Sequence, residues 1–199
     1  MSQKSFSKRA VEADALRLRH RANRGSKHYN LGNGHQVTFS IRRACREDAN
    51  FVLELFTLPH VREFTHGPKS IEVFVNALER GDRELLIIDR GGRPFGHLVI
   101  AVLDGWLMEI RVIAFEEQRT GAGRFSMEWL LHRAFEDLGL HRIFLEVVES
   151  NTGAQALYER VGFLREGCYR DGYRADDGTF HNLIPYGILS PQDSRASNC

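Results

Sequence analysis

A glycine-bearing segment, Gln118-Arg119-Thr120-Gly121-Ala122-Gly123, lies between the apolar run 110–115 and an amphipathic segment that starts near Arg124. A strand that runs into such a turn and then into a helix leaves backbone N–H groups unpaired at the helix start, all facing one way. Gly121 and Gly123 carry no Cβ, so the backbone can take positive φ and a diphosphate can approach closely. The segment predicts a phosphate-binding turn, although a glycine pair alone also fits a tight turn without a ligand.

A second segment runs from Asn151 to Phe163 and follows the strand-like apolar run 143–148. Asn151 can cap a helix at its start and Gly162 can end it. Tyr158 lies between them, and a neutral phenol can donate a hydrogen bond or a proton to a departing anion. The structural alternatives are a plain helix cap for Asn151 and an amphipathic core position for Tyr158.

Together the two segments resemble the acetyl-CoA-binding core of the GNAT superfamily of acyl-CoA N-acyltransferases. The first matches the family pattern of Gln or Arg, two residues, Gly, one residue, then Gly or Ala, and the second matches its strand, Asn, helix, Tyr and terminal Gly-Phe. The resemblance covers residues 39–189 and is nearest to the branch that acetylates ribosomal-protein N-termini or small amines. It implies transfer of an acetyl group from acetyl-CoA to a primary amine by direct attack in a ternary complex, with a small amine or a protein N-terminus as acceptor.

The resemblance also implies which residues bind acetyl-CoA. In the family, two strands splay apart beside the phosphate turn, here 109–113 and 144–148, and the pantetheine arm lies in the gap like an added strand. The implied role of Tyr158 is to protonate or orient the leaving sulfur, and that of Asn151 is to contact the cofactor or order a water. The implied cofactor-binding residues are Arg111, Val112, Ile113, Gln118, Arg119, Thr120, Gly121, Ala122, Gly123, Arg124, Asn151 and Tyr158.

The residue that takes the proton from the amine is open. Glu109 lies on the strand before the phosphate turn, where some family members place their base, and it is our catalytic candidate beside Tyr158. Glu146, His60 and His66 are rivals, and a water chain would serve an amine that is already partly neutral. The resemblance implies that the helix-loop-helix edge around 59–69 forms one wall of the acceptor site. His60 and His66 are therefore also candidate substrate-binding residues, with exposed loop residues as the alternative.

Length and composition favour one soluble, cytoplasmic domain. The chain has 199 residues and is 42% hydrophobic, enough for one core. The three cysteines lack the paired spacing of a zinc site or disulfide framework, and the histidines lack metal-ligand spacing, so no metal is expected. No run approaches the roughly 20 apolar residues of a membrane span, and the N-terminus lacks the apolar core of a secretory signal.

The chain divides into a basic arm at 1–36, an acetyltransferase domain at 37–190 and a short polar tail at 191–199. The arm, expected to be flexible or partly helical, holds eight Lys/Arg and two Asp/Glu, against 19 and 24 in the rest of the chain. A solvated arm is the simpler interpretation, and contact with nucleic acid or the ribosome is the functional one. The sequence leaves open whether the chain forms a homodimer.

Hydrophobic periodicity predicts an α+β fold. The expected order is a strand at 37–42, two helices within 47–58 and 70–79, three antiparallel strands, a helix at 124–138, a strand at 143–148, a helix at 152–161 and two last strands. This is the layout that the GNAT resemblance implies: a mixed, mostly antiparallel, twisted sheet of about seven strands flanked by about four helices.

A different functional class is also consistent with these motifs. A non-catalytic domain that binds acyl-CoA or CoA, as a sensor or docking module, needs the phosphate turn and the splayed strands as well. Tyr158 favours the enzyme, because a pure binder has no use for a leaving-group acid. The identity of the acceptor amine does not follow from the sequence.

Overall fold

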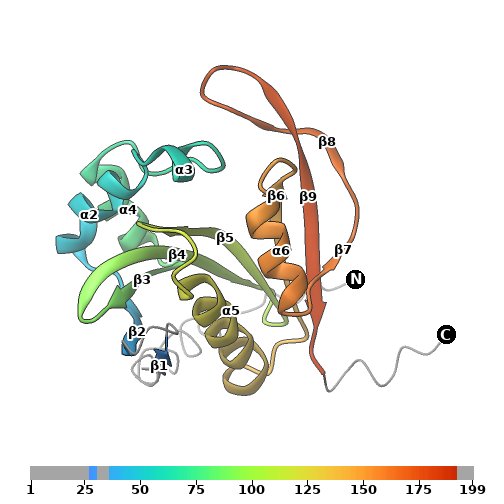
Figure 1. Ribbon diagram of the computed structural model, residues 1–199, viewed down its shortest axis with the longest axis horizontal. Coiled ribbons are helices and arrows are strands. Elements are labelled where there is room, and N and C mark those ends of the chain that lie inside the picture. Colours follow the sequence, from blue (N-terminus) through green and yellow to red (C-terminus); the bar gives the residue numbers. More distant parts are fainter. Residues whose placement is uncertain (1–26, 31–35, 192–199) are drawn as a thin grey trace, which may run out of the picture.

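The computed structural model describes residues 27–30 and 36–191, which form nine strands and five α-helices. The strands make one sheet in the order β1-β2-β3-β4-β5-β6-β9-β7, with β8 paired to β9 (Figure 1). Only β5 and β6 pair in parallel, and every other neighbouring pair is antiparallel. The sheet is therefore mixed, with its one parallel pair near the middle.

The elements have the following bounds. The strands are β1 (Lys27–Asn30), β2 (Gln36–Arg43), β3 (Glu84–Arg90), β4 (Arg93–Leu103), β5 (Leu107–Phe115), β6 (Arg142–Val148), β7 (Leu164–Arg165), β8 (Tyr169–Arg174) and β9 (Phe180–Leu189). The helices are α2 (Ala49–Leu55), α3 (Pro59–Arg62), α4 (Ile71–Arg80), α5 (Ala122–His132) and α6 (Thr152–Arg160). A 3-10 turn, η1 (Arg46–Asp48), precedes α2, and a π-helical turn, η2 (Arg133–Asp137), follows α5.

Both faces of the sheet are covered, because successive side chains of a strand point to opposite sides. On β3, Leu86 and Ile88 pack into the core cluster that includes Phe125 of α5. Leu85 and Ile87 join the cluster on the other face, which includes residues of α2 and α4. The sheet thus separates the α5 and α6 side from the α2 and α4 side.

The predicted α+β fold is confirmed, with differences in detail. The additional strands are short: β1 has four residues and β7 has two. Pro59 was expected to open a loop, but it begins α3, because the fixed φ of proline suits the first helical position. Ser70 caps α4 at its start, accepting a hydrogen bond from the Val73 N–H at 3.3 Å. The pairing of β1 with β2 draws residues 27–30 of the predicted arm into the sheet.

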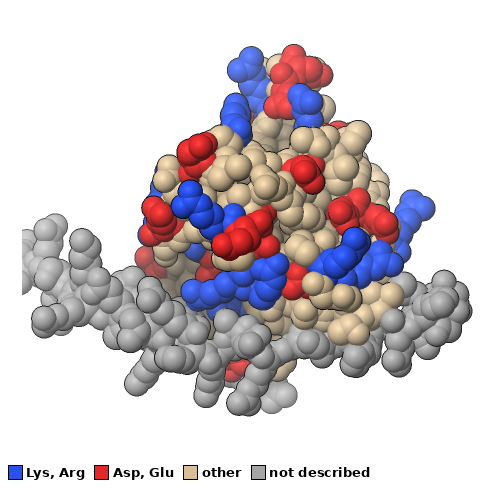
Figure 2. Space-filling view, turned by 90° about the vertical axis from the view of Figure 1, so that its left-hand side faces the viewer, with Lys and Arg blue, Asp and Glu red and all other residues tan. Residues whose placement is uncertain are grey.

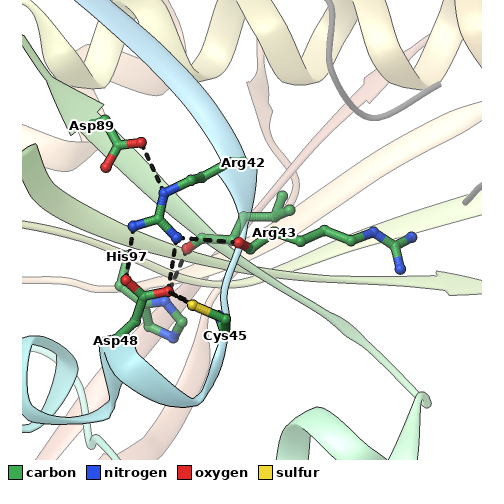
Figure 3. A network of polar contacts seen from close by, with 7 residues as sticks. Arg42, Arg43, Cys45, Asp48, Asp89 and His97 are labelled. Carbon is green, nitrogen blue, oxygen red and sulfur yellow. Dashed lines mark hydrogen bonds and ion pairs between the residues drawn. The ribbon is translucent and has the colours of Figure 1, made fainter. Parts of the chain in front are cut away.

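A polar network holds β2, η1 and β3 together (Figure 3). The Arg42 guanidinium donates to Asp48 at 2.7 and 2.8 Å and to Asp89 at 2.9 Å. The Cys45 thiol donates to Asp48 at 3.2 Å. Hydrogen bonds with the Glu47 and Asp48 side chains raise the pKa of Cys45, which favours the protonated thiol over the nucleophilic thiolate.

The surface drawn in Figure 2 carries both signs of charge. Basic and acidic side chains are interspersed there, and the described residues of this face form no single-sign patch. The predicted contact with nucleic acid or the ribosome depends on arm residues 1–26 and 31–35, which lie outside the described residues, as does the tail 192–199. This face adds nothing to that prediction, since mixed charge gives little net attraction to phosphates.

Candidate active site

The predicted phosphate turn connects β5 to α5. Gly121 is the residue before α5 and has a φ of 87°, and Arg119 has a φ of 60°. A Cβ built on Gly121 would meet no heavy atom within 4 Å, so the left-handed backbone is what favours glycine there. The first turn of α5 holds no acidic residue, so its N–H groups and helix dipole present a positive end.

Gly123 contributes in another way. It lies within α5, and a Cβ built on it would be 2.9 Å from Cδ2 of Leu157 on α6. The missing side chain therefore lets α5 and α6 approach each other, which brings the phosphate turn next to α6. The expectation of positive φ is met at Gly121 but not at Gly123, which has an ordinary helical conformation.

The strands β5 and β6 splay apart as expected. Their parallel pairing stops at Ile110 and Leu145, although the strands continue to Phe115 and Val148. At the same point the pairing of β5 with β4 shifts by one residue, which makes Arg111 the extra residue of a β-bulge. Because a bulge bends and twists its strand, β5 turns away from β6 from this residue onward.

A groove of about 760 Å³ lies between the splayed strands, the phosphate turn, α6 and the segment around α3. Its volume is within the range of ligand sites, about 300–1,000 Å³. The predicted site residues that line it are His60, Arg111, Val112, Ile113, Gln118, Arg119, Thr120, Gly121, Gly123, Arg124, Asn151 and Tyr158. The predicted site residues Glu109, Ala122 and His66 do not line it. The structure thus brings most of the predicted site residues, from segments far apart in the chain, together in one groove.

Three arginines line the groove near the phosphate turn: Arg119 on the turn, Arg124 on α5 and Arg160 on α6. Their charges and the start of α5 fit the phosphates of acetyl-CoA, because each supplies donors to an anion. Arg160 is not among the residues predicted from the sequence. It follows Gly153 and Leu157 at helical spacing, and all three line the groove, so helical periodicity along α6 could have identified it.

Tyr158 lines the groove from α6, with only 5% of its surface exposed. Its ring centroid lies 6.1 Å from that of Phe163 and 6.0 Å from that of Tyr186, so packing fixes its position. Among the described residues, no hydrogen bond involves its hydroxyl. Burial raises the pKa of Tyr158 far above its usual value, so the phenol keeps the proton that it could donate.

Asn151 caps α6 and also lines the groove. Its Oδ1 accepts a hydrogen bond from the Ala154 N–H at 3.1 Å, which confirms the predicted helix cap. The contact with acetyl-CoA that the resemblance implies stays a prediction.

Two glutamates lie near each other on the paired strands β5 and β6. Glu109 pairs in register with Phe144, two residues before Glu146, and its Oε2 is 2.6 Å from Nη2 of Arg111. Glu146 lines the groove. Partial burial raises the pKa of Glu146, and the negative charge of Glu109 raises it further. Glu146 is therefore a stronger proton acceptor than an ordinary carboxylate, while Glu109 is held in an ion pair.

The two predicted histidines have separate positions. His60 lines the groove, and its Nε2 is 2.9 Å from the carbonyl oxygen of Phe115 at the end of β5. Since a carbonyl only accepts, Nε2 carries the proton. His66 contacts the β8–β9 hairpin instead, with Nε2 at 3.1 Å from the carbonyl oxygen of Arg174 and Nδ1 at 3.4 Å from Oδ1 of Asp176.

Within residues 27–30 and 36–191, no three His, Cys, Asp or Glu side chains gather as a metal site requires. No helix in the same part of the chain has the length and apolar character to cross a membrane.

Comparison with known proteins places this site in a family. The chain is 31% identical over 138 residues to the [Ribosomal protein bS18]-alanine N-acetyltransferase of Escherichia coli, covering 66% of this chain and 91% of that protein. It is 36% identical over 77 residues to the "Putative ribosomal N-acetyltransferase YdaF" of Bacillus subtilis, but this match spans only 39% of the chain and 42% of the relative.

A solved structure shares the fold. The spermidine N-acetyltransferase of Vibrio cholerae, crystallised with CoA and spermine, superposes with a TM-score of 0.68 at 21% identity, covering 76% of this chain and 95% of that one. The family model described as "Acetyltransferase (GNAT) family" matches residues 49–163. These residues include the phosphate turn, both splayed strands and α6. The chain belongs to the GNAT family of acetyltransferases, which use acetyl-CoA as the acyl donor.

Proposed function

We propose that this enzyme transfers the acetyl group of acetyl-CoA to the N-terminal amine of a protein, by direct attack of the amine in a ternary complex. The observation that carries the proposal is a single groove lined by the phosphate turn, Tyr158 and Glu146. The relative that acetylates a ribosomal-protein alanine is matched over 91% of its length, which favours a protein terminus as acceptor. A small amine is the second candidate, because the spermidine enzyme shares the fold.

Acetyl-CoA supplies an acetyl thioester, and this chain supplies a site of matching chemistry. The start of α5 with Arg119, Arg124 and Arg160 would hold its phosphates. Beyond Ile110 the edge of β5 that faces β6 has no pairing with it, so the backbone of 111–113 would pair with the pantetheine amides as an added strand. Both contacts orient the donor without any covalent step by the protein.

The transfer requires two proton movements. The attacking amine loses a proton, and we assign its acceptance to Glu146, directly or through a water, because Glu146 lines the groove and has a raised pKa. The departing sulfur gains a proton or a hydrogen bond, and we assign this to the hydroxyl of Tyr158. The ammonium loses one proton to Glu146 or solvent before it attacks, and the nitrogen loses a second once the carbon–nitrogen bond has formed. The carbon–sulfur bond then breaks, and the second proton, passed through solvent, replaces any proton that the sulfur takes from Tyr158.

We assign Glu109 an indirect role, in which it raises the proton affinity of Glu146. Glu109 forms an ion pair with Arg111 and does not line the groove. Its charge raises the pKa of Glu146. The proposed base is therefore Glu146 in place of Glu109, and both glutamates keep a role at the site.

The test measures thiol release from acetyl-CoA with a heptapeptide that begins with alanine, with the same peptide blocked at its N-terminus, and with spermidine. We expect release with the free peptide and none with the blocked one, and mass spectrometry should locate the acetyl group on the α-amine. Release with spermidine alone would favour the small-amine class. Calorimetric binding of acetyl-CoA without release by any amine would instead support the non-catalytic sensor.

Further sequence predictions extend this proposal. A cytoplasmic location, a homodimer and a ribosome contact through residues 1–36 are consistent with a protein acceptor. Gel filtration and ribosome co-sedimentation of the full chain test the last two.

A further inference from the structure

A set of contacts joins the segment around α3 to the tip of the β8–β9 hairpin. Arg62 Nε donates to Oδ2 of Asp176 at 2.8 Å. The ring of His66 stacks on that of Tyr173 with centroids 5.0 Å apart, and its nitrogens lie 3.1 Å from the Arg174 carbonyl oxygen and 3.4 Å from Oδ1 of Asp176. We call these contacts between Arg62 or His66 and Tyr173, Arg174 or Asp176 the clasp.

The clasp connects two different walls of the groove. One wall is the segment that carries Arg62 and His66, and its groove-lining residues are His60, Val61, Phe64 and Thr65. The other wall is β6, which β9 accompanies as far as the pair Val148 and Leu183. From there the hairpin continues past the end of β6 and curves toward α3 (Figure 1). The clasp therefore links the two walls beyond the end of β6, although none of its own residues lines the groove.

The clasp is built from partners that can separate. The exposed fractions of the side chains are 63% for Arg62 and 49% for both His66 and Asp176. Solvent-exposed ion pairs are worth little, because water screens them and long side chains lose freedom on pairing. Such contacts can hold two segments together most of the time and still release them when a larger molecule enters.

We propose that the clasp determines which acceptors the enzyme acetylates: when closed it admits slender amines and extended chain ends, and it retards amines that are carried directly on a folded surface. The inference rests on the proposed acetyl transfer, since it concerns the acceptor of that reaction. Asp176 is the central residue, because both Arg62 and His66 contact its carboxylate.

Two variants open the clasp from opposite sides. Asp176→Asn removes a negative charge and Arg62→Gln removes a positive one, so an electrostatic effect on an ammonium acceptor would have opposite signs in the two variants. Loss of the clasp would act in the same direction in both. Asp177→Asn is the matched control, because Asp177 accepts from the Thr179 N–H of its own turn at 2.9 Å and has no contact with the segment around α3 among the described residues.

The kinetic measurement compares the alanine heptapeptide with the same peptide fused without a linker to a small folded domain. We expect Asp176→Asn and Arg62→Gln each to raise kcat/KM for the fused acceptor by roughly two- to fivefold, the size that exposed ion pairs allow, with the free peptide and Asp177→Asn unchanged. Equal changes for both acceptors, opposite signs in the two variants, or no change would each overturn the proposal.

A second measurement does not depend on activity. In a chain whose three cysteines are replaced by serine, Glu146→Cys places a thiol in the groove. Labelling by N-ethylmaleimide should be the same with and without Asp176→Asn, while labelling by a polyethylene-glycol maleimide should be faster with it. If neither acceptor is acetylated by the unaltered enzyme, the proposed protein acceptor is wrong. The ratio of the two labelling rates still decides on the clasp, and an unaltered ratio would overturn it.

Discussion

Replacement of Tyr158 by phenylalanine separates the chemistry of α6 from its packing. The ring would keep its neighbours Phe163 and Tyr186, and the lost hydroxyl has no partner among the described residues. The free energy of unfolding should therefore change by less than about 0.5 kcal/mol. The departing sulfur would lose its donor, so kcat should fall by about 10- to 1,000-fold, which corresponds to about 1.4–4 kcal/mol of transition-state stabilisation.

The assay follows thiol release at saturating acetyl-CoA and alanine heptapeptide, with acetyl-CoA affinity from calorimetry and stability from urea unfolding. The affinity should be nearly unchanged, because we assign the binding of the phosphates and the pantetheine to other residues. A kcat equal to that of the unaltered enzyme would refute the assignment of Tyr158 as the donor to sulfur.

Tyr186→Phe is the matched control from the neighbouring strand β9. Tyr186 is fully buried and does not line the groove, and its hydroxyl donates to Oε1 of Glu159 at 2.8 Å. Loss of this bond to a charged group should cost about 1–3 kcal/mol of stability and leave kcat unchanged. If Tyr158→Phe lowers the free energy of unfolding as much as Tyr186→Phe does, its loss of activity comes from disturbed packing, and the assignment of Tyr158 as the donor to sulfur is refuted.

Three further predictions follow from other parts of the site and the core. Measured by calorimetry, Gly121→Asp should weaken acetyl-CoA binding at least about tenfold more than Gly121→Asn. Aspartate and asparagine both tolerate a left-handed φ, but only the carboxylate of aspartate repels phosphate. Equal affinities in the two variants would contradict phosphate binding at this turn. Glu146→Gln should lower kcat, and this defect should shrink as pH rises and the amine arrives deprotonated. Glu109→Gln should keep kcat at high pH but move the acid limb of the pH–rate profile to lower pH, because the pKa of Glu146 falls without the charge of Glu109. A pH-independent loss of kcat in Glu146→Gln would leave water as the base. Burial lowers the pKa of His97 from 6.5 to about 4, so below pH 6.5 the unfolded chain binds a proton on this residue while the folded chain does not. The free energy of unfolding should therefore fall by up to about 3 kcal/mol between pH 6.5 and 4. Urea unfolding that shows the same slope in His97→Gln would exclude this cause.

The parts of the site that sequence predicts well are those encoded by neighbours in the chain. The phosphate turn and the segment from Asn151 to Phe163 each combine a strand end, a cap and a helix within a few residues, so local spacing fixes which side chains gather. Arg160 would also have followed from the spacing along α6. In these cases the geometry of one helix or one turn is enough to place the residue.

The parts that sequence predicts poorly depend on register and on contacts between distant segments. The choice between Glu109 and Glu146 depends on the bulge at Arg111, since one extra residue in β5 decides where the strands separate. The contact of His66 with the carbonyl of Arg174 joins residues 108 positions apart, and no local pattern encodes it. Likewise, Gly123 lets α5 approach Leu157 closely, and the sequence does not reveal this role because it depends on where α6 packs.

The segment around α3 is held differently at its two ends, and this difference explains why its opening should affect the acceptor and not the donor. At one end, His60 donates to the carbonyl of Phe115, a partly buried bond to the last residue of β5, next to the phosphate turn. At the other end, Arg62 and His66 hold exposed partners on the hairpin. Because exposed ion pairs are the weaker contacts, the segment should release at the hairpin first and stay attached to β5. The donor end of the groove then keeps its shape, so Asp176→Asn should alter kcat/KM for large acceptors while the affinity for acetyl-CoA stays the same. A parallel loss of acetyl-CoA affinity in Asp176→Asn would show that the two ends of the groove are not independent.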